Sequence, residues 1–187
     1  MIELFEVAKE LQFLCERQQW EFCFIGGVAL QRWGEPRVTQ DVDVTLLTGF
    51  GHEEAFIQVL LAHFKARTHH AKAFALRNRV LLLKSETGIG IDIALGALDF
   101  EKLVVQRASV YEFLPGINLR TCSAEDLIIY KAFADRPRDW GDIEGVILRQ
   151  QGHLDWDYVY EQLTPLVTLK EQPEILEKLG NLKAKII

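Results

Sequence analysis

The sequence predicts an α+β core followed by a helical lobe, and two observations lead to this expectation. Short apolar or β-branched runs alternate with helical patterns up to about residue 120. From Ser123 onward, only helical patterns occur. We therefore expect a core over residues 1–120 and a C-terminal helical lobe over residues 121–187.

Local patterns define the first elements. Apolar side chains at helical spacing predict a helix over residues 3–18. Residues 20–25 are typical of a short buried strand that ends at a Gly-Gly pair. Residues 28–33 suit a short helix, and Gly34 is placed to end it as a left-handed cap.

The rest of the core alternates in the same way. Polar–apolar alternation with β-branched side chains predicts a strand over residues 41–47. The turn residues Ser85–Gly88 predict a hairpin between two further strands. The remaining elements are expected as a helix over 53–66, strands over 80–84 and 89–95, a helix over 100–107, and a strand pair broken at 115–116.

Capping and proline signals delimit the lobe. Ser123 followed by Asp126 resembles a capping box, which predicts a helix through residue 134. Pro137 disfavours helical backbone at Arg136 and should end that helix. Further helices are expected over 140–149, 158–166 and 173–182.

Composition excludes a disordered tail, a collagen-like fibre and a disulfide-stapled miniprotein. Of 187 residues, 49% are apolar and 26% are charged, which is ordinary for a globular protein. No run approaches the roughly 18 apolar residues of a membrane span, and the N-terminus lacks a signal peptide's layout. Three cysteines without paired spacing favour a cytoplasmic protein. The formal net charge of −6 means that global charge does not steer the protein to nucleic acid.

The most informative pattern is a pair of carboxylates on the predicted strand 41–47. Asp41 and Asp43 leave the same face, because side chains alternate along a strand. Neighbouring carboxylates repel each other unless a cation lies between them. Mg²⁺ commonly binds one or two carboxylates together with substrate phosphates. The alternative is a strand edge with two solvated aspartates.

Two further features favour the metal. Gly26 and Gly27 lie between a strand and a helix, where backbone N–H groups can approach an anion, although many Gly-Gly pairs only form a turn. Asp92 is the single carboxylate of an apolar strand, where an unpaired charge is costly; a bond to an Arg or the backbone is the alternative. If the two strands are neighbours, three carboxylates converge and could hold two metal ions.

This combination resembles the nucleotidyltransferase fold of the DNA polymerase β superfamily. The shared pattern is Gly26-Gly27, thirteen intervening residues, Asp41-Val42-Asp43 and a later strand Asp. The minimal nucleotidyltransferases, especially the AbiEii toxin branch, are the most similar group. The segments that resemble this group are Gly26–Leu30, Arg37–Val44, Ser123–Lys131 and Arg136–Asp142, within about residues 20–150.

The resemblance implies a metal-dependent enzyme with a mixed sheet flanked by helices. It implies that Asp41, Asp43 and Asp92 bind Mg²⁺ or Mn²⁺. Asp92 would also lower the pKa of the attacking hydroxyl through a shared metal, or act as its base. Gly26 and Gly27 would offer backbone N–H groups to the phosphates of an NTP.

Two basic residues in the segments that resemble the family could be functional or structural. Arg37 could bind phosphate or brace Asp41, or it could be a surface arginine at a strand edge. Lys131, on the first lobe helix, could reach the triphosphate, or it could be a solvated helix lysine.

Arg138, Asp139 and Asp142 are possible contributors from the lobe. The two acids are three residues apart and share a helix face. They could complete the site, or they could cap a helix start, where the helix dipole favours carboxylates. Capping is expected for one of the two acids, and the role of the other stays open.

The segment between Glu54 and Glu86 is basic. No acid occurs between Glu54 and Glu86, whereas six basic residues do. They could form a contact stripe for RNA or a nucleotide tail, or a solvated face. These residues are Lys65, Arg67, Lys72, Arg77, Arg79 and Lys84.

The resulting hypothesis is transfer of an NMP from an NTP to an acceptor hydroxyl. The AbiEii resemblance implies an RNA acceptor, such as a tRNA end, and an antitoxin protein as partner. A small-molecule acceptor, as in the antibiotic-modifying relatives, is one alternative. An inactive binding or partner module is another: the short chain without a separate acceptor domain keeps it open, whereas the complete carboxylate set argues against it.

Overall fold

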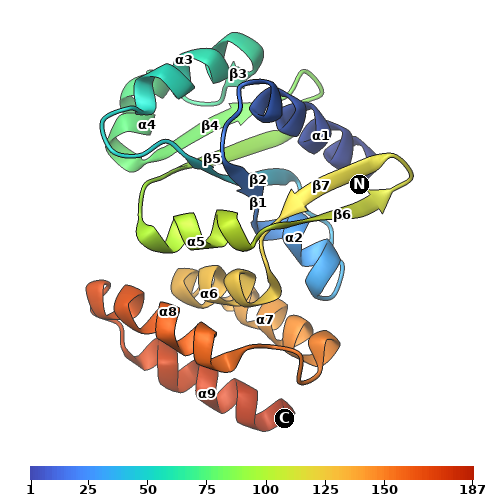
Figure 1. Cartoon of the computed structure of the whole chain (residues 1–187), viewed down its shortest axis with the longest axis vertical. Helices are drawn as coiled ribbons and strands as arrows, with labels where there is room; N and C mark the ends of the chain where they lie inside the picture. The colour runs from blue at the N-terminus through green and yellow to red at the C-terminus, as the bar shows by residue number, and fades with distance from the viewer. The chain divides into compact units, whose positions relative to one another are not determined.

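A computed structural model describes all residues, Met1–Ile187, and confirms the α+β class. Nine helices accompany one seven-stranded mixed sheet of order β3-β4-β5-β2-β1-β7-β6 (Figure 1). No helix combines the length and apolar character needed to cross a bilayer.

The chain forms two compact units. The first contains residues 1–28 and 38–122, and the second contains residues 29–37 and 123–187. The second unit therefore takes the end of one early helix and the loop after it, together with the chain from residue 123 onward.

The first unit contains the whole sheet. Its strands are β1 (Phe22–Phe24), β2 (Asp41–Leu47), β3 (Lys65–Ala66), β4 (Val80–Lys84), β5 (Gly90–Gly96), β6 (Ser109–Leu114) and β7 (Ile117–Thr121). Its helices are α1 (Ile2–Arg17), α3 (Glu53–His63), α4 (Ala71–Asn78) and α5 (Asp99–Arg107), and α2 (Gly26–Trp33) starts in it.

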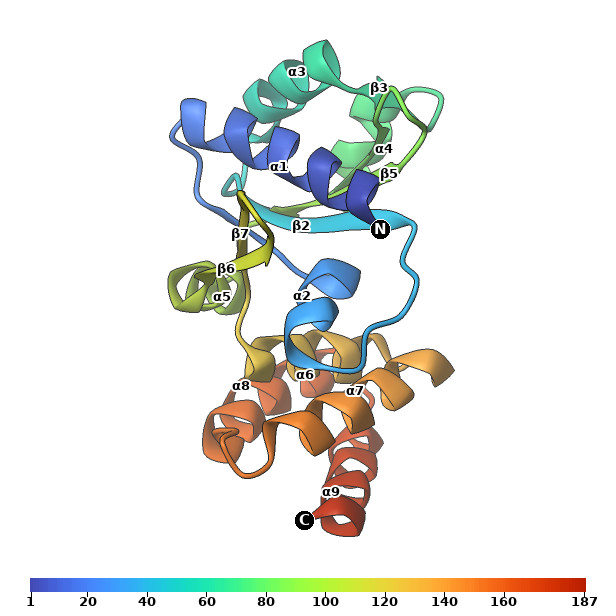
Figure 2. The same cartoon turned by 90° about the vertical axis from the view of Figure 1, so that its right-hand side faces the viewer.

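Helices cover both faces of the sheet. Helices α1, α3 and α4 lie on one face and α5 lies on the other (Figures 1 and 2). The main core fills the first interface, where apolar faces of α1 and α3 meet alternate residues of β2 and β5. Burial of these side chains contributes roughly 1.5–3 kcal/mol for each large apolar group.

The region between β2 and β4 differs from the expectation. The predicted helix 53–66 ends at His63, because Phe64 is extended and the next two residues pair with β4. Helix α4 was not predicted, since it buries only Ala71 and Ala75 and so lacks a broad apolar stripe. By contrast, the hairpin of β4 and β5 is confirmed.

Gly34 does not act as the predicted left-handed cap, because it does not have a positive φ. A Cβ at Gly34 would lie 2.7 Å from Leu30 Cδ1 and 2.9 Å from Val146 Cγ2. Close packing within the second unit therefore explains this glycine.

The second unit consists mainly of α6 (Ala124–Ala134), α7 (Pro137–Gln150), α8 (Trp156–Leu169) and α9 (Glu174–Ile186). The predicted cap is confirmed, since the Asp126 N–H donates to Ser123 Oγ at 3.1 Å. Helix α6 ends at Ala134, and Pro137 opens α7, where its missing N–H costs no hydrogen bond.

Candidate active site

Two parallel strands bring the three predicted acids onto one face of the sheet. In the register of β2 and β5, Asp43 lies opposite Asp92, and Asp41 lies opposite Gly90. Neighbouring strands lie about 4.8 Å apart, so Asp43 and Asp92 project side by side. The intervening Val42 is fully buried on the other face. The expectation that the two strands are neighbours is therefore confirmed.

Glycines make room for these carboxylates. At Gly26, φ is +53°, and an added Cβ would overlap the carboxylate of Asp43. The N–H of Gly27 donates to Asp43 Oδ2 at 3.3 Å. At Gly90, a Cβ would overlap Asp41 Oδ1. Gly26 and Gly27 thus lie directly beside the acids, and their contact with phosphates stays a prediction.

Arg67 lies among these acids. The sequence predicted it only as one of the six basic residues between Glu54 and Glu86, and not as a site residue. Arg67 Nη1 is 3.3 Å from Asp41 Oδ1, and Arg67 Nη2 contacts Asp92 Oδ1. The Arg67 side chain is 29% exposed, so this bridge is only partly open to solvent. The sequence did not predict that Arg67 lies at the edge of the sheet, because the two residues of β3 that precede it fell inside the helix expected over 53–66.

The donor set of this face suits a hard divalent cation. Carboxylate oxygens are the ligands that Mg²⁺ and Mn²⁺ prefer, and the guanidinium of Arg67 already bridges Asp41 and Asp92 as a positive charge. No three acidic, histidine or cysteine side chains are gathered closely enough to form a ready-made metal cluster. Asp41, Asp43 and Asp92, which share this face, are the residues that would hold such a metal.

Other predicted residues form a separate ionic cluster within the second unit. Lys131 Nζ lies 2.5 Å from Asp142 Oδ2 and 3.2 Å from Asp139 Oδ1. Arg37 Nε and Nη2 both bind the Asp142 carboxylate at 2.8 Å. Lys131 is 4% exposed, and Asp139 is fully buried. Lys131 is therefore not the solvated lysine of the alternative interpretation, and its contact with a triphosphate stays a prediction.

The electrostatics of this cluster favour the charged form of the Asp142 carboxylate. Burial by itself raises the pKa of Asp142, but hydrogen bonds from Arg37 and Lys131 outweigh it and hold that pKa below its ordinary value. Such a cluster stabilises the fold only while it is complete, because one partner left alone would be a buried unpaired charge.

The remaining lobe residues have distinct positions. The N-cap of α7 is Arg136, so neither of the two predicted acids caps this helix through its side chain. Asp139 lies in the first turn, where the helix dipole favours it, and Arg136 Nε binds it at 2.5 Å. Arg138 is exposed on α7.

The basic residues between Glu54 and Glu86 do not form one surface: some pair with acids of α3, and others lie at the edge of the sheet. Lys72 pairs with Glu54 at 2.7 Å, and Arg79 pairs with Glu53 at 2.5 Å. The strand register places Lys65 and Lys84 in line with Asp41, on the sheet face that also carries Arg67. The stretch is therefore not one stripe, and its cations at the sheet edge share a face with the carboxylates.

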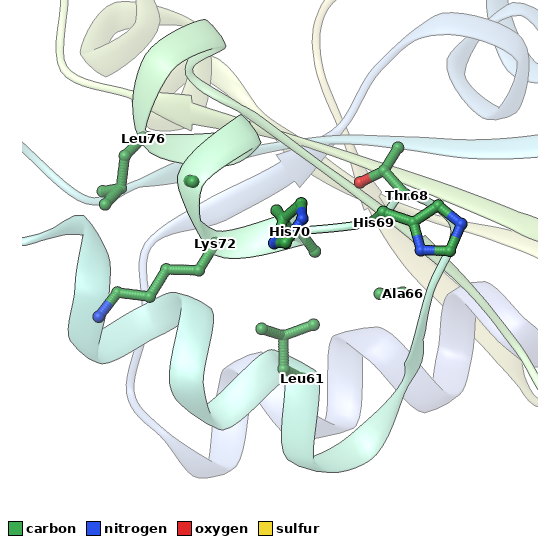
Figure 3. A pocket seen from close by; sticks show the side chains of 9 residues that line it. Leu61, Ala66, Thr68, His69, His70, Lys72 and Leu76 are labelled. Atoms are coloured by element: carbon green, nitrogen blue, oxygen red, sulfur yellow. The ribbon is translucent and has the colours of Figure 1, made fainter.

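A cavity of about 640 Å³ lies elsewhere in the first unit, between α3, β3 and α4 (Figure 3). Leu61, His69, His70 and Leu76 are among the residues that line it. None of the three carboxylates lines it. The chemistry-bearing acids and this largely apolar cavity are thus separate features.

No model of a known protein family matches the chain, and no curated protein sequence matches it. Solved structures do match. The antibiotic-resistance factor ANT(2'')-Ia is 15% identical over 96% of this chain and 97% of its own, with a TM-score of 0.55. A nucleotidyltransferase-like protein from Paracoccidioides brasiliensis is 17% identical over 96% of this chain and 93% of its own, with a TM-score of 0.52.

The lincosamide antibiotic adenylyltransferase LnuA is 18% identical over 73% of this chain and 92% of its own, with a TM-score of 0.50. At such low identities, these likenesses show the fold, which is that of the nucleotidyltransferases. The fold expected from the sequence is confirmed, and the AbiEii branch stays a prediction.

Proposed function

We propose that the protein is a metal-dependent nucleotidyltransferase that moves an NMP from an NTP to an acceptor hydroxyl. The observation that carries this proposal is the placement of Asp41, Asp43 and Asp92 on one sheet face, beside the Gly26-Gly27 turn. The nucleotidyltransferase fold supports it.

The proposed reaction forms one bond and breaks one. The acceptor oxygen attacks the α-phosphorus of the NTP, and the bond from that phosphorus to the bridging oxygen of the β-phosphate breaks. Pyrophosphate leaves, and the hydroxyl proton passes to the Asp92 carboxylate or to water. Mg²⁺ or Mn²⁺ would neutralise phosphate charge and make the hydroxyl more acidic.

Each residue then has a positional role. Asp41, Asp43 and Asp92 would hold the metal that neutralises phosphate charge, and Asp92 would also align the acceptor hydroxyl. Gly26 and Gly27, at the start of α2, would offer backbone N–H groups to the phosphates. Positioning and charge neutralisation are most of what a phosphoryl-type transfer requires.

The central test is incubation of the purified chain with each labelled NTP and Mg²⁺, together with total RNA or total protein. Asp43→Asn should reduce labelling at least about 100-fold, because it removes a carboxylate that would hold the metal, and the metal would neutralise the charge of the transition state. Asp157→Asn, the same change at an exposed acid of the second unit, should keep full activity. Equal labelling by wild type and Asp43→Asn would contradict the proposal.

Calorimetry distinguishes the enzyme from an inactive fold member. Titration of Mg²⁺-NTP should give heat with wild type and none with Asp43→Asn. A protein that serves only as a binding or partner module would show no heat that depends on the carboxylate.

For the acceptor, we propose RNA. Lys65 and Lys84 share the sheet face of the carboxylates, and phosphate backbones bind clustered basic side chains. RNA labelling should fall as salt rises and should fall further in Lys84→Ala. Labelling of a small hydroxyl compound instead of RNA would favour the small-molecule alternative, such as the lincosamide antibiotic named for LnuA.

A toxin role and an antitoxin partner remain proposals from the AbiEii resemblance. Induced expression should arrest growth of a bacterial host with wild type but not with Asp43→Asn. Growth at the normal rate with active wild-type enzyme would remove the toxin role and leave the transfer reaction in place.

A further inference from the structure

Arg67 lies where a cation between the carboxylates is needed. Its guanidinium reaches Asp41 at 3.3 Å and also contacts Asp92, although these acids are on two different strands. An Arg side chain carries several donors in a rigid fork, so one residue can bind both carboxylates at once. The metal proposed for this face would need oxygens of the same two acids.

The strand register explains how an edge residue reaches the centre of the sheet. The Arg67 N–H donates to Leu82 O at 2.9 Å, and Leu82 lies opposite Asp92 in the next pairing. Arg67, Leu82, Asp92 and Asp43 thus form one row across the sheet, about two strand spacings from Arg67 to Asp92. The Arg67 backbone is therefore held by the sheet edge while its long side chain lies over the strands.

Space at Gly90 permits this contact. A Cβ on Gly90 would overlap Asp41 Oδ1 and would lie 2.8 Å from Arg67 Nη1. The absent side chain therefore leaves room for the carboxylate and the guanidinium together.

We propose that Arg67 is a positioning residue that occupies the carboxylates in the metal-free protein and moves to the nucleotide phosphates when the metal binds. This inference rests on the proposed function. Arg67 supplies one positive charge, whereas Mg²⁺ or Mn²⁺ supplies two and prefers hard oxygens, so the metal displaces the guanidinium. Phosphate oxygens accept two parallel hydrogen bonds from Arg, as carboxylates do, which gives the displaced side chain a new partner.

The test measures metal affinity without nucleotide and without catalysis. Mn²⁺ is titrated into the full chain, and free Mn²⁺ is followed by its electron paramagnetic resonance signal. Arg67→Ala should bind Mn²⁺ about fivefold or more tightly than wild type, because a charge-assisted competitor for the ligands is gone. Arg67→Lys should be intermediate, since it keeps the charge but not the two-pronged contact.

Lys65→Ala is the matched control. It removes the same charge from the same edge, and Lys65 pairs with Glu86 at 2.9 Å. Lys65 is about three strand spacings from Asp41, farther than the screening length of roughly 8–10 Å. Its Mn²⁺ affinity should stay within about twofold of wild type.

The second measurement is the affinity for a non-hydrolysable α,β-methylene NTP analogue at saturating Mn²⁺. Here Arg67→Ala should bind about fivefold or more weakly, because the phosphates lose a charge-assisted partner. Opposite changes in the two affinities support the proposal, since a residue that only stabilises the fold would weaken both. Unchanged or weaker Mn²⁺ binding in Arg67→Ala, or unchanged analogue binding, would overturn it. Failure of the transfer assay would not produce these results, so the two proposals are tested separately.

Discussion

At the scale of single residues, the candidate site depends on glycines, whose lack of a side chain leaves space for a neighbouring carboxylate. Gly26 has a φ of +53°, and a Cβ there would overlap the Asp43 carboxylate. A substitution therefore strains the backbone and also displaces a proposed metal ligand. The glycine is explained by the carboxylate beside it as well as by the turn that it makes.

Gly26→Ala should weaken Mn²⁺ binding at least about tenfold, because the added methyl group pushes Asp43 out of place. It should also lower the free energy of unfolding by about 1–3 kcal/mol. Gly116→Ala is the control, since Gly116 has a φ of +78° but nothing within 4 Å of an added Cβ. It should lose stability without losing Mn²⁺ affinity. Equal Mn²⁺ affinities in the two variants would contradict the role of the close contact.

A second residue-scale prediction concerns pH. Hydrogen bonds from Arg37 and Lys131 hold the pKa of Asp142 below its ordinary value despite burial. The pKa is lower in the folded state, so the stabilisation is present above the unfolded value of about 3.9 and is lost as pH falls through the folded value. Wild type should therefore lose free energy of unfolding below about pH 4 more steeply than Asp142→Asn. Urea unfolding at several pH values measures both slopes, and identical slopes would contradict the argument.

At the scale of elements, the start of a helix can be predicted from the sequence where a nearby residue provides the hydrogen bond or the backbone conformation that the first turn needs. Ser123 accepts the Asp126 N–H at 3.1 Å, which fixes the start of α6. Pro137 likewise opens α7 after extended backbone at Arg136. These starts could be predicted because the residues involved are neighbours in the sequence.

Ser123→Ala should lower the free energy of unfolding by about 1 kcal/mol, because one N–H of the first turn loses its acceptor. Ser123→Thr keeps a hydroxyl at the same place and should recover most of the loss. Urea denaturation checks both variants. If Thr were as destabilising as Ala, hydrogen bonding by the cap would not be the cause.

Non-local pairing explains the elements that the sequence did not predict. Strand β3 has two residues and pairs only with β4, and α4 buries two alanines. Neither segment carries a long periodic pattern of its own. The sheet and its neighbours, and not local propensity, decide their structure.

At the scale of the whole molecule, ligand binding should be coupled to stability. A ligand that binds only the folded protein stabilises it by about 2.7 kcal/mol at one hundred times its Kd. Mg²⁺ with an α,β-methylene NTP analogue should therefore raise the Tm of wild type by roughly 5–10 °C for a chain of this size. Thermal scanning should show almost no shift for Asp43→Asn. A similar shift in that variant would place the ligand away from the carboxylates.

The sequence by itself determined the features that depend on short separations. Alternation in Asp41-Val42-Asp43 placed two carboxylates on one face, and the Gly26-Gly27 turn lay at a helix start as expected. The cap at Ser123 follows from a side-chain hydrogen bond between residues that are neighbours in the sequence.

Only the tertiary structure decided which distant charges meet. It set Asp92 opposite Asp43, brought Arg67 to these acids, and enclosed Lys131 with Asp139 and Asp142. Such contacts join residues on different strands or helices, so no spacing in the sequence specifies them. They form because strand register and helix packing fix the backbone, after which buried or crowded charges are stable only beside opposite ones.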